Sequence, residues 1–235
     1  MNAVLGLMIF DQWWWLFIPG LLLGVYAQMR LSSSYKKYIN EPVLSGVSGA
    51  EAARQILNET GLFNVQVYEV DGHLTDHYDP TTRSLHLSKQ NFHGRTIAAL
   101  GVSAHEAGHA LQHQAAYGPL ELRMKLVPVM GFASQGAFWI SMAGMFIGLT
   151  KLALFGVVVF GVITLFQLIT LPVEFDASRR AKQILLRTGL VEREESNGVA
   201  QVLDAAAWTY VAAMVSSLLT LLHFVLILRG DDRES

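Results

Sequence analysis

The sequence predicts a mainly helical integral membrane protein, with four transmembrane helices and a polar segment of helices and strands after the first. Of the 235 residues, 52% are hydrophobic and 15% are charged, and the mean hydropathy is +0.36. These values favour a membrane protein, and four long apolar runs carry most of the hydrophobic residues. The formal net charge of −2 and the lack of a basic domain argue against nucleic-acid binding.

Each of the four apolar runs is a predicted transmembrane helix. A helix needs about 20 mostly apolar residues to cross a bilayer, within a range of about 17–25. The runs lie at 13–29, 126–150, 152–173 and 209–228. The first is at the short end of the range, and its tryptophans fit the aromatic belt found at membrane surfaces.

The polar residues between the runs form two segments. The predicted division is transmembrane helix 1 at 1–29, a polar segment at 30–125, transmembrane helices 2 and 3 at 126–173, a second polar segment at 174–208, and helix 4 with a short tail at 209–235. The two polar segments hold 14 of the 17 Lys and Arg residues. The positive-inside rule therefore places both in the cytoplasm and both termini outside.

The first polar segment has its own predicted secondary structure. Ser48 and Glu51 form a capping box that opens a helix reaching about Thr60. Residues 63–70 and 84–87 are rich in β-formers and bounded by turn signals, which predicts two short strands. The strand at 84–87 is a candidate to lie beside the functional site and pair with an extended substrate. An Ala- and Leu-rich stretch without proline predicts a helix at about 96–114.

This last helix contains the sequence His105-Glu106-Ala107-Gly108-His109. In a helix, two histidines four residues apart lie one turn apart on the same face, where both can bind one Zn²⁺. Glu106 lies beside them and can act on a metal-bound water, as in the HExxH motif of zinc peptidases. A hydrolytic zinc needs a third protein ligand. Since the chain has no cysteine, that ligand must supply nitrogen or oxygen.

Two residues are candidates for the third ligand. His113 follows one turn later, but three successive turns of a straight helix diverge too far to hold one ion. A surface position or a supporting contact is the better interpretation of this histidine. Glu174 lies where the third apolar run ends, on the same predicted side as residues 105–109. A carboxylate at the edge of a span is costly without a partner, and an ion pair with Arg179 or Arg180 would satisfy it equally well.

Three motifs together resemble the YugP-like membrane zinc metallopeptidases: LTDHYDP at 74–80, GRTIAALGVSAHEAGHA at 94–110 and PVEFDASRRA at 172–181. More distantly, the chain is similar to HtpX-type and CAAX prenyl proteases, whose third ligand lies in a Glu-aromatic-x-Ala-Asp segment. Glu174, Phe175 and Ala177 match that segment, whereas Ser178 stands where it has Asp. The resemblance implies a zincin-like α+β segment, with His105, His109 and Glu174 as zinc ligands.

The expected activity is hydrolysis of peptide bonds by an integral-membrane zinc metalloendopeptidase. Zn²⁺ would lower the pKa of a bound water towards about 7, and Glu106 would be the general base. His77 and Tyr78 are candidate donors to the oxyanion, although an ordinary turn explains them as well.

Other details of the site stay open at this point. Asp176 or Asp204 is a candidate to accept a hydrogen bond from a ligating imidazole. The substrate-binding residues and the oligomeric state are not determined by the sequence.

The expected partners are a polypeptide substrate, membrane-associated or not, and the lipid bilayer. The expected location is the plasma membrane of a bacterium, with several spans and the site facing the cytoplasm. The alternative is a zinc-binding membrane adaptor or structural protein without proteolytic activity. Glu106 argues against that alternative, because a structural metal site has no use for a general base.

Overall fold

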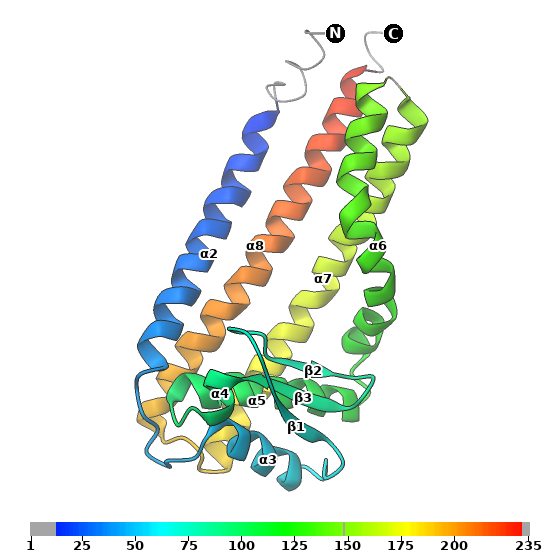
Figure 1. Ribbon diagram of the computed structural model, residues 1–235. Helices are drawn as coiled ribbons and strands as arrows, with labels where there is room; N and C mark the ends of the chain where they lie inside the picture. The colour runs from blue at the N-terminus through cyan, green and yellow to red at the C-terminus, as the bar shows by residue number, and fades with distance from the viewer. Residues whose placement is uncertain (1–12, 148, 232–235) are drawn as a thin grey trace. The chain divides into compact units, whose positions relative to one another are not determined.

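The computed structural model of the chain describes residues 13–147 and 149–231 (Figure 1). The elements are, in chain order, η1 (Trp14–Leu16), α2 (Phe17–Tyr38), α3 (Gly49–Glu59), β1 (Gln66–Val70), β2 (His77–Asp79), β3 (Ser84–Ser88), α4 (Lys89–His93), α5 (Ile97–Gln114), α6 (Gly118–Phe146), α7 (Thr150–Arg187) and α8 (Arg193–Asp231). The prediction of a mainly helical chain is thus confirmed. The first twelve residues of the predicted segment 1–29, and the last four of 209–235, lie outside the described residues.

The chain forms two compact units. The first is made of Met1–Tyr26, Leu122–Thr170 and Tyr210–Ser235, and the second of Ala27–Glu121 and Leu171–Thr209. The second unit overlaps the two polar segments predicted at 30–125 and 174–208. The side of a membrane on which these segments lie stays a prediction.

The second unit contains a sheet of three short strands in the order β1-β3-β2. β3 runs parallel to β1 and antiparallel to β2. The strand predicted at 84–87 is therefore the central one, since β1 pairs along the whole of β3 and β2 pairs with its residues 84–86 on the other side. The expectation that this strand pairs with an extended substrate is wrong for that reason, and the edges of the sheet are β1 and β2.

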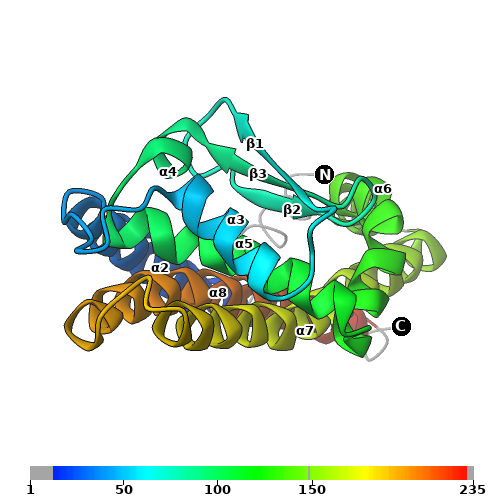
Figure 2. The same ribbon diagram turned by 90° about the horizontal axis from the view of Figure 1, so that it is seen from below.

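The helices of the second unit build its core against this sheet. α3 packs along α5, and α5 also contacts β2 and β3 (Figure 2). Leu85 and Leu87 are fully buried, and so is Ala104 of α5, whose small side chain permits close packing. The predicted capping box is confirmed: Ser48 Oγ accepts from Glu51 N, and the Glu51 carboxylate accepts from Ser48 N.

The first unit consists of parts of the long helices, which pack through small and hydroxyl-bearing residues. A Cβ placed on Gly156 of α7 would lie 2.6 Å from the backbone nitrogen of Ser141 of α6, so the two helices touch backbone to backbone. Between α7 and α8, Thr164 Oγ1 and Ser217 Oγ share a buried hydrogen bond of 2.7 Å. Close approach at small residues and hydrogen bonds between helices are typical of helix packing in membranes.

Two helices in the described part of the chain are long and apolar enough to cross a membrane. They are Leu154–Arg187 within α7 and Arg193–Leu228 within α8, each with a mean hydropathy of 2.4 in its most apolar window. The prediction of four spans goes further and stays a prediction. α7 continues through Pro172 to Arg187, so the helix does not end where its apolar run ends. Glu174 is therefore held by helical backbone on both sides.

Candidate metal centre

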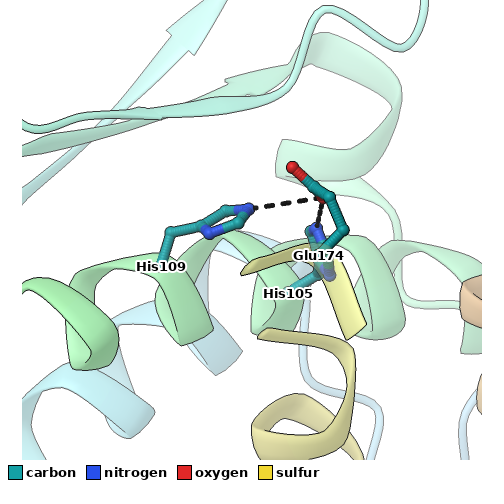
Figure 3. A group of neighbouring side chains, drawn as sticks. All are labelled: His105, His109 and Glu174. Carbon is teal, nitrogen blue, oxygen red and sulfur yellow. Dashed lines mark hydrogen bonds and ion pairs between the residues drawn. The ribbon is translucent and has the colours of Figure 1, made fainter. Parts of the chain in front are cut away.

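His105 and His109 lie one turn apart on α5, and both face Glu174 of α7 (Figure 3). The Nε2 atom of His105 is 3.2 Å from Glu174 Oε2, and the Nε2 atom of His109 is 3.7 Å from the same oxygen. The two imidazole rings are nearly perpendicular, with centroids 4.8 Å apart. The fold thus brings together the three residues that the sequence predicts as ligands, although Glu174 is 69 residues from His105 in the chain.

The donor set fits a zinc ion. Each of the three residues offers one ligand atom, and these atoms all lie within 4.8 Å of one another. Donors about 2.1 Å from a tetrahedral zinc lie about 3.4 Å apart, close to the separations of 3.2 and 3.7 Å. Two imidazoles and one carboxylate are also a ligand set of catalytic zinc, which keeps its fourth position open.

Gly108 allows α7 to approach α5 closely. A Cβ at this position would lie 2.8 Å from the carbonyl oxygen of Ala177 and 3.3 Å from its Cα. The glycine of the motif and the alanine three residues after Glu174 therefore allow backbone contact between the helices. Both flanking residues on α5, Ala107 and His109, are buried, so the contact is part of the packed interior.

The other ring nitrogen of each histidine also has a partner. Ser178 Oγ lies 3.1 Å from His105 Nδ1, and Gln112 Oε1 lies 3.0 Å from His109 Nδ1. Ligating histidines are usually oriented in this way, by an acceptor for the ring N–H that points away from the metal. Ser178, which departs from the Glu-aromatic-x-Ala-Asp pattern, is therefore in contact with the site.

Glu106 is buried, with 8% of its surface exposed. Among the residues that the structure describes, none forms a hydrogen bond or an ion pair with its carboxylate. The negative charge of Glu106 nevertheless affects the pKa of His109. Burial lowers the pKa of His109, but the hydrogen bond and charge of Glu174, with the charge of Glu106, raise it above the ordinary value.

The other residues that the sequence suggested for the site, His113, His77 and Asp204, are not part of the cluster of His105, His109 and Glu174. Nδ1 of His113 is 2.9 Å from the hydroxyl of Tyr78, and His113 is outside the ligand cluster. His77 is exposed and stacks on His86 of the neighbouring strand, with ring centroids 4.7 Å apart. Asp204 pairs with a lysine through a 2.9 Å hydrogen bond.

Asp176 is linked to the candidate site through Gln112. It accepts a hydrogen bond of 3.0 Å from Gln112 Nε2 and pairs with Arg179 and Arg180. Of the two carboxylates considered from the sequence, Asp176 is therefore the one linked to His109, through Gln112. The sequence alone did not indicate that Gln112, Ser178 and Gly108 make contacts at this site. The available signal for Gln112 was its position three residues after His109, on the same helical face.

Comparison with known proteins identifies the family of the chain. Residues 13–229 match the family described as “Putative neutral zinc metallopeptidase”. The chain is 50% identical over 218 residues to the protein named “Putative membrane protease YugP” of Bacillus subtilis (strain 168), an alignment that covers 92% of this chain and 97% of the relative. No solved structure matches the chain. Because the family match covers most of its length, the chain belongs to this family.

Proposed function

We propose that this protein is an integral-membrane zinc-dependent metalloendopeptidase, with His105, His109 and Glu174 as its zinc ligands. The observation that carries the proposal is the carboxylate of Glu106, which lies directly after His105 in the chain, belongs to a residue with only 8% of its surface exposed, and has no hydrogen-bond or ion-pair partner among the described residues. A site that only holds a metal for structure would gain nothing from it.

The chemistry assigned to each residue follows from this arrangement. Zinc, when bound, would polarise the scissile carbonyl and make a water molecule more acidic. The Glu106 carboxylate takes a proton from the attacking water while the oxygen of this water bonds to the carbonyl carbon. The same carboxyl group then gives this proton to the amine nitrogen as the carbon–nitrogen bond breaks. His105 and His109 would bind the metal as neutral imidazoles through Nε2, while their Nδ1 atoms keep partners in Ser178 and Gln112.

The proposed location is the plasma membrane, with four spans and the site on the cytoplasmic side. Support comes from the two long apolar helices and from large apolar side chains exposed on two others, such as Leu21 of α2 (67%) and Trp139 of α6 (70%). The bias of Lys and Arg towards 30–125 and 174–208 supports the orientation.

Because the chain has no cysteine, single introduced cysteines test the orientation without background. Lys89→Cys should react with an impermeant maleimide only after cells are lysed. Lys151→Cys, between the second and third apolar runs, should react in intact cells. The reverse labelling pattern would refute the orientation and leave the metal site untouched.

The alternative is a zinc-binding membrane adaptor or structural protein, and Glu106→Gln separates it from the peptidase. We expect the variant, purified in detergent, to retain zinc and to lose cleavage of an unfolded polypeptide by a factor of about 10² or more. Glu121→Gln makes the same change at an exposed glutamate and should retain both properties. Equal cleavage by the wild type and Glu106→Gln would contradict the peptidase proposal. Loss of zinc from Glu174→Ala is expected for a third ligand.

A further inference from the structure

Gln112 is a fully buried amide on the ligand helix, and all of its hydrogen-bonding groups face named partners. Its Oε1 is 3.0 Å from His109 Nδ1. Its Nε2 donates to the backbone carbonyl of Val173 at 2.7 Å and to Asp176 Oδ2 at 3.0 Å. Since Val173 and Asp176 flank Glu174, this one side chain contacts both a histidine ligand and the turn of α7 that carries the carboxylate ligand.

The partners of Gln112 determine which way its amide points. A carbonyl oxygen and a carboxylate can only accept hydrogen bonds, so both must face the NH₂ group. Oε1 is then directed towards His109, and an amide oxygen can only accept. The ring nitrogen Nδ1 of His109 must therefore carry the proton. In the neutral ring this leaves the lone pair on Nε2, the atom that faces Glu174.

Asp176 holds this arrangement in place. Its carboxylate is buried, with 6% of its surface exposed, and it pairs with both Arg179 and Arg180. It therefore stays ionised, as an acceptor of hydrogen bonds from Gln112. The chain of contacts runs from the arginines through Asp176 and Gln112 to His109. Through these contacts, the tautomer of His109 depends on the position of α7.

We propose that Gln112 is a positioning residue of the metal site, which selects the metal-binding tautomer of His109 and aligns it with Glu174. This inference rests on the proposed function, because it concerns the same site. It goes beyond the ligand set in assigning a role to an uncharged residue outside the HExxH motif, and it makes Asp176 the anchor of that role.

The test is Gln112→Leu in the full chain in detergent, with zinc affinity measured by competition with a chromophoric chelator. Leucine fills a similar volume but accepts no hydrogen bond from His109. We expect zinc affinity to fall about 10- to 100-fold, as is typical when the partner of a ligating histidine is removed. The visible absorption of the Co²⁺-loaded protein should also change, because the ligand geometry changes.

The matched control is Gln114→Leu, two residues further along the same helix. Gln114 is exposed and donates to the carbonyl of Thr60, so its replacement should leave zinc affinity and the Co²⁺ spectrum unchanged. A merely structural role for Gln112 predicts a lower Tm of the metal-free protein with unchanged zinc affinity, and that result overturns the inference.

Asp176→Asn provides a second variant if Gln112→Leu does not fold. Asparagine can present either an oxygen or an NH₂ group to Gln112, so the amide is no longer directed by a charge, and we expect a smaller loss of zinc affinity. Wild-type affinity in this variant would count against the proposal. Absence of zinc binding by the wild type would instead refute the proposed function itself, and the Glu174→Ala variant shows that the assay detects loss of a ligand.

Discussion

Gly108→Ala tests whether the close contact between α5 and α7 assembles the proposed metal site. The added Cβ would lie 2.8 Å from the carbonyl oxygen of Ala177, whereas ordinary contact begins at 3.4 Å. The obstacle is backbone, which cannot rotate away, so α7 must move by about 0.6 Å at this point. Metal–ligand distances tolerate only about 0.2 Å, and Glu174 is one turn away on the same helix.

The size of the expected loss of zinc affinity follows from the strain that the added methyl group causes. An extra methyl group in a packed interior typically costs about 1–3 kcal/mol. The metal-free protein can relieve this strain by letting the helices separate, but zinc binding must draw them together again. A cost of this size lowers zinc affinity about 5- to 150-fold. The unfolding stability of the metal-free protein changes less, since alanine favours helix over glycine by about 0.5–1 kcal/mol.

Gly101→Ala is the matched control, because it makes the same change in the same helix. Its Cβ would meet Val199 Cγ1 at 3.5 Å, which is ordinary contact. Zinc affinity, measured by chelator competition in detergent, should fall in Gly108→Ala and stay at the wild-type value in Gly101→Ala. Wild-type affinity in both variants would refute the reasoning, since the ligands would then not depend on the contact.

Two further predictions concern the surroundings of the site. Ser178→Ala removes the partner of His105 Nδ1 and should lower zinc affinity about tenfold with little change in Tm; an unchanged affinity would show that Ser178 does not orient the ring. Burial and the charge of Asp76 raise the pKa of Tyr35 from 10.0 to about 12. The folded state then holds this proton more tightly than the unfolded state, so its contribution to stability is complete below pH 10 and is lost as the pH rises towards 12. The Tm advantage of wild type over Tyr35→Phe should shrink over that interval, and a gap independent of pH would contradict the assignment.

The local elements of this protein were predictable because local patterns specify them. The capping box at Ser48 and Glu51 opens α3, and the helix predicted at about 96–114 is α5 at Ile97–Gln114. The two histidines four residues apart needed only the helical repeat to place them on one face. Here the physical determinants, backbone hydrogen bonding and side-chain spacing, lie within a few residues of each other.

The pairing of the sheet could not be predicted in this way. The strand at 84–87 was recognised, but its position between β1 and β2 depends on a parallel partner from residues 66–70. Strand order is determined by which faces are buried together, and this depends on α3 and α5 as well as on the strands. The same holds for Gln112, because its hydrogen bonds to Val173 and Asp176 of α7 form only when the two helices pack together.

By itself, then, the sequence determined the elements and the chemistry: apolar runs of spanning length, two imidazoles one turn apart, and a glutamate beside them. Spacing alone left Glu174 between a metal ligand and an ion pair with an arginine, and the family resemblance favoured the ligand. Only the tertiary structure brought its carboxylate within 3.2 Å of His105, and only there do Gly108, Ser178 and Gln112 acquire roles. The physical reason is distance along the chain, since residues 69 positions apart meet only when the packing of whole helices is decided.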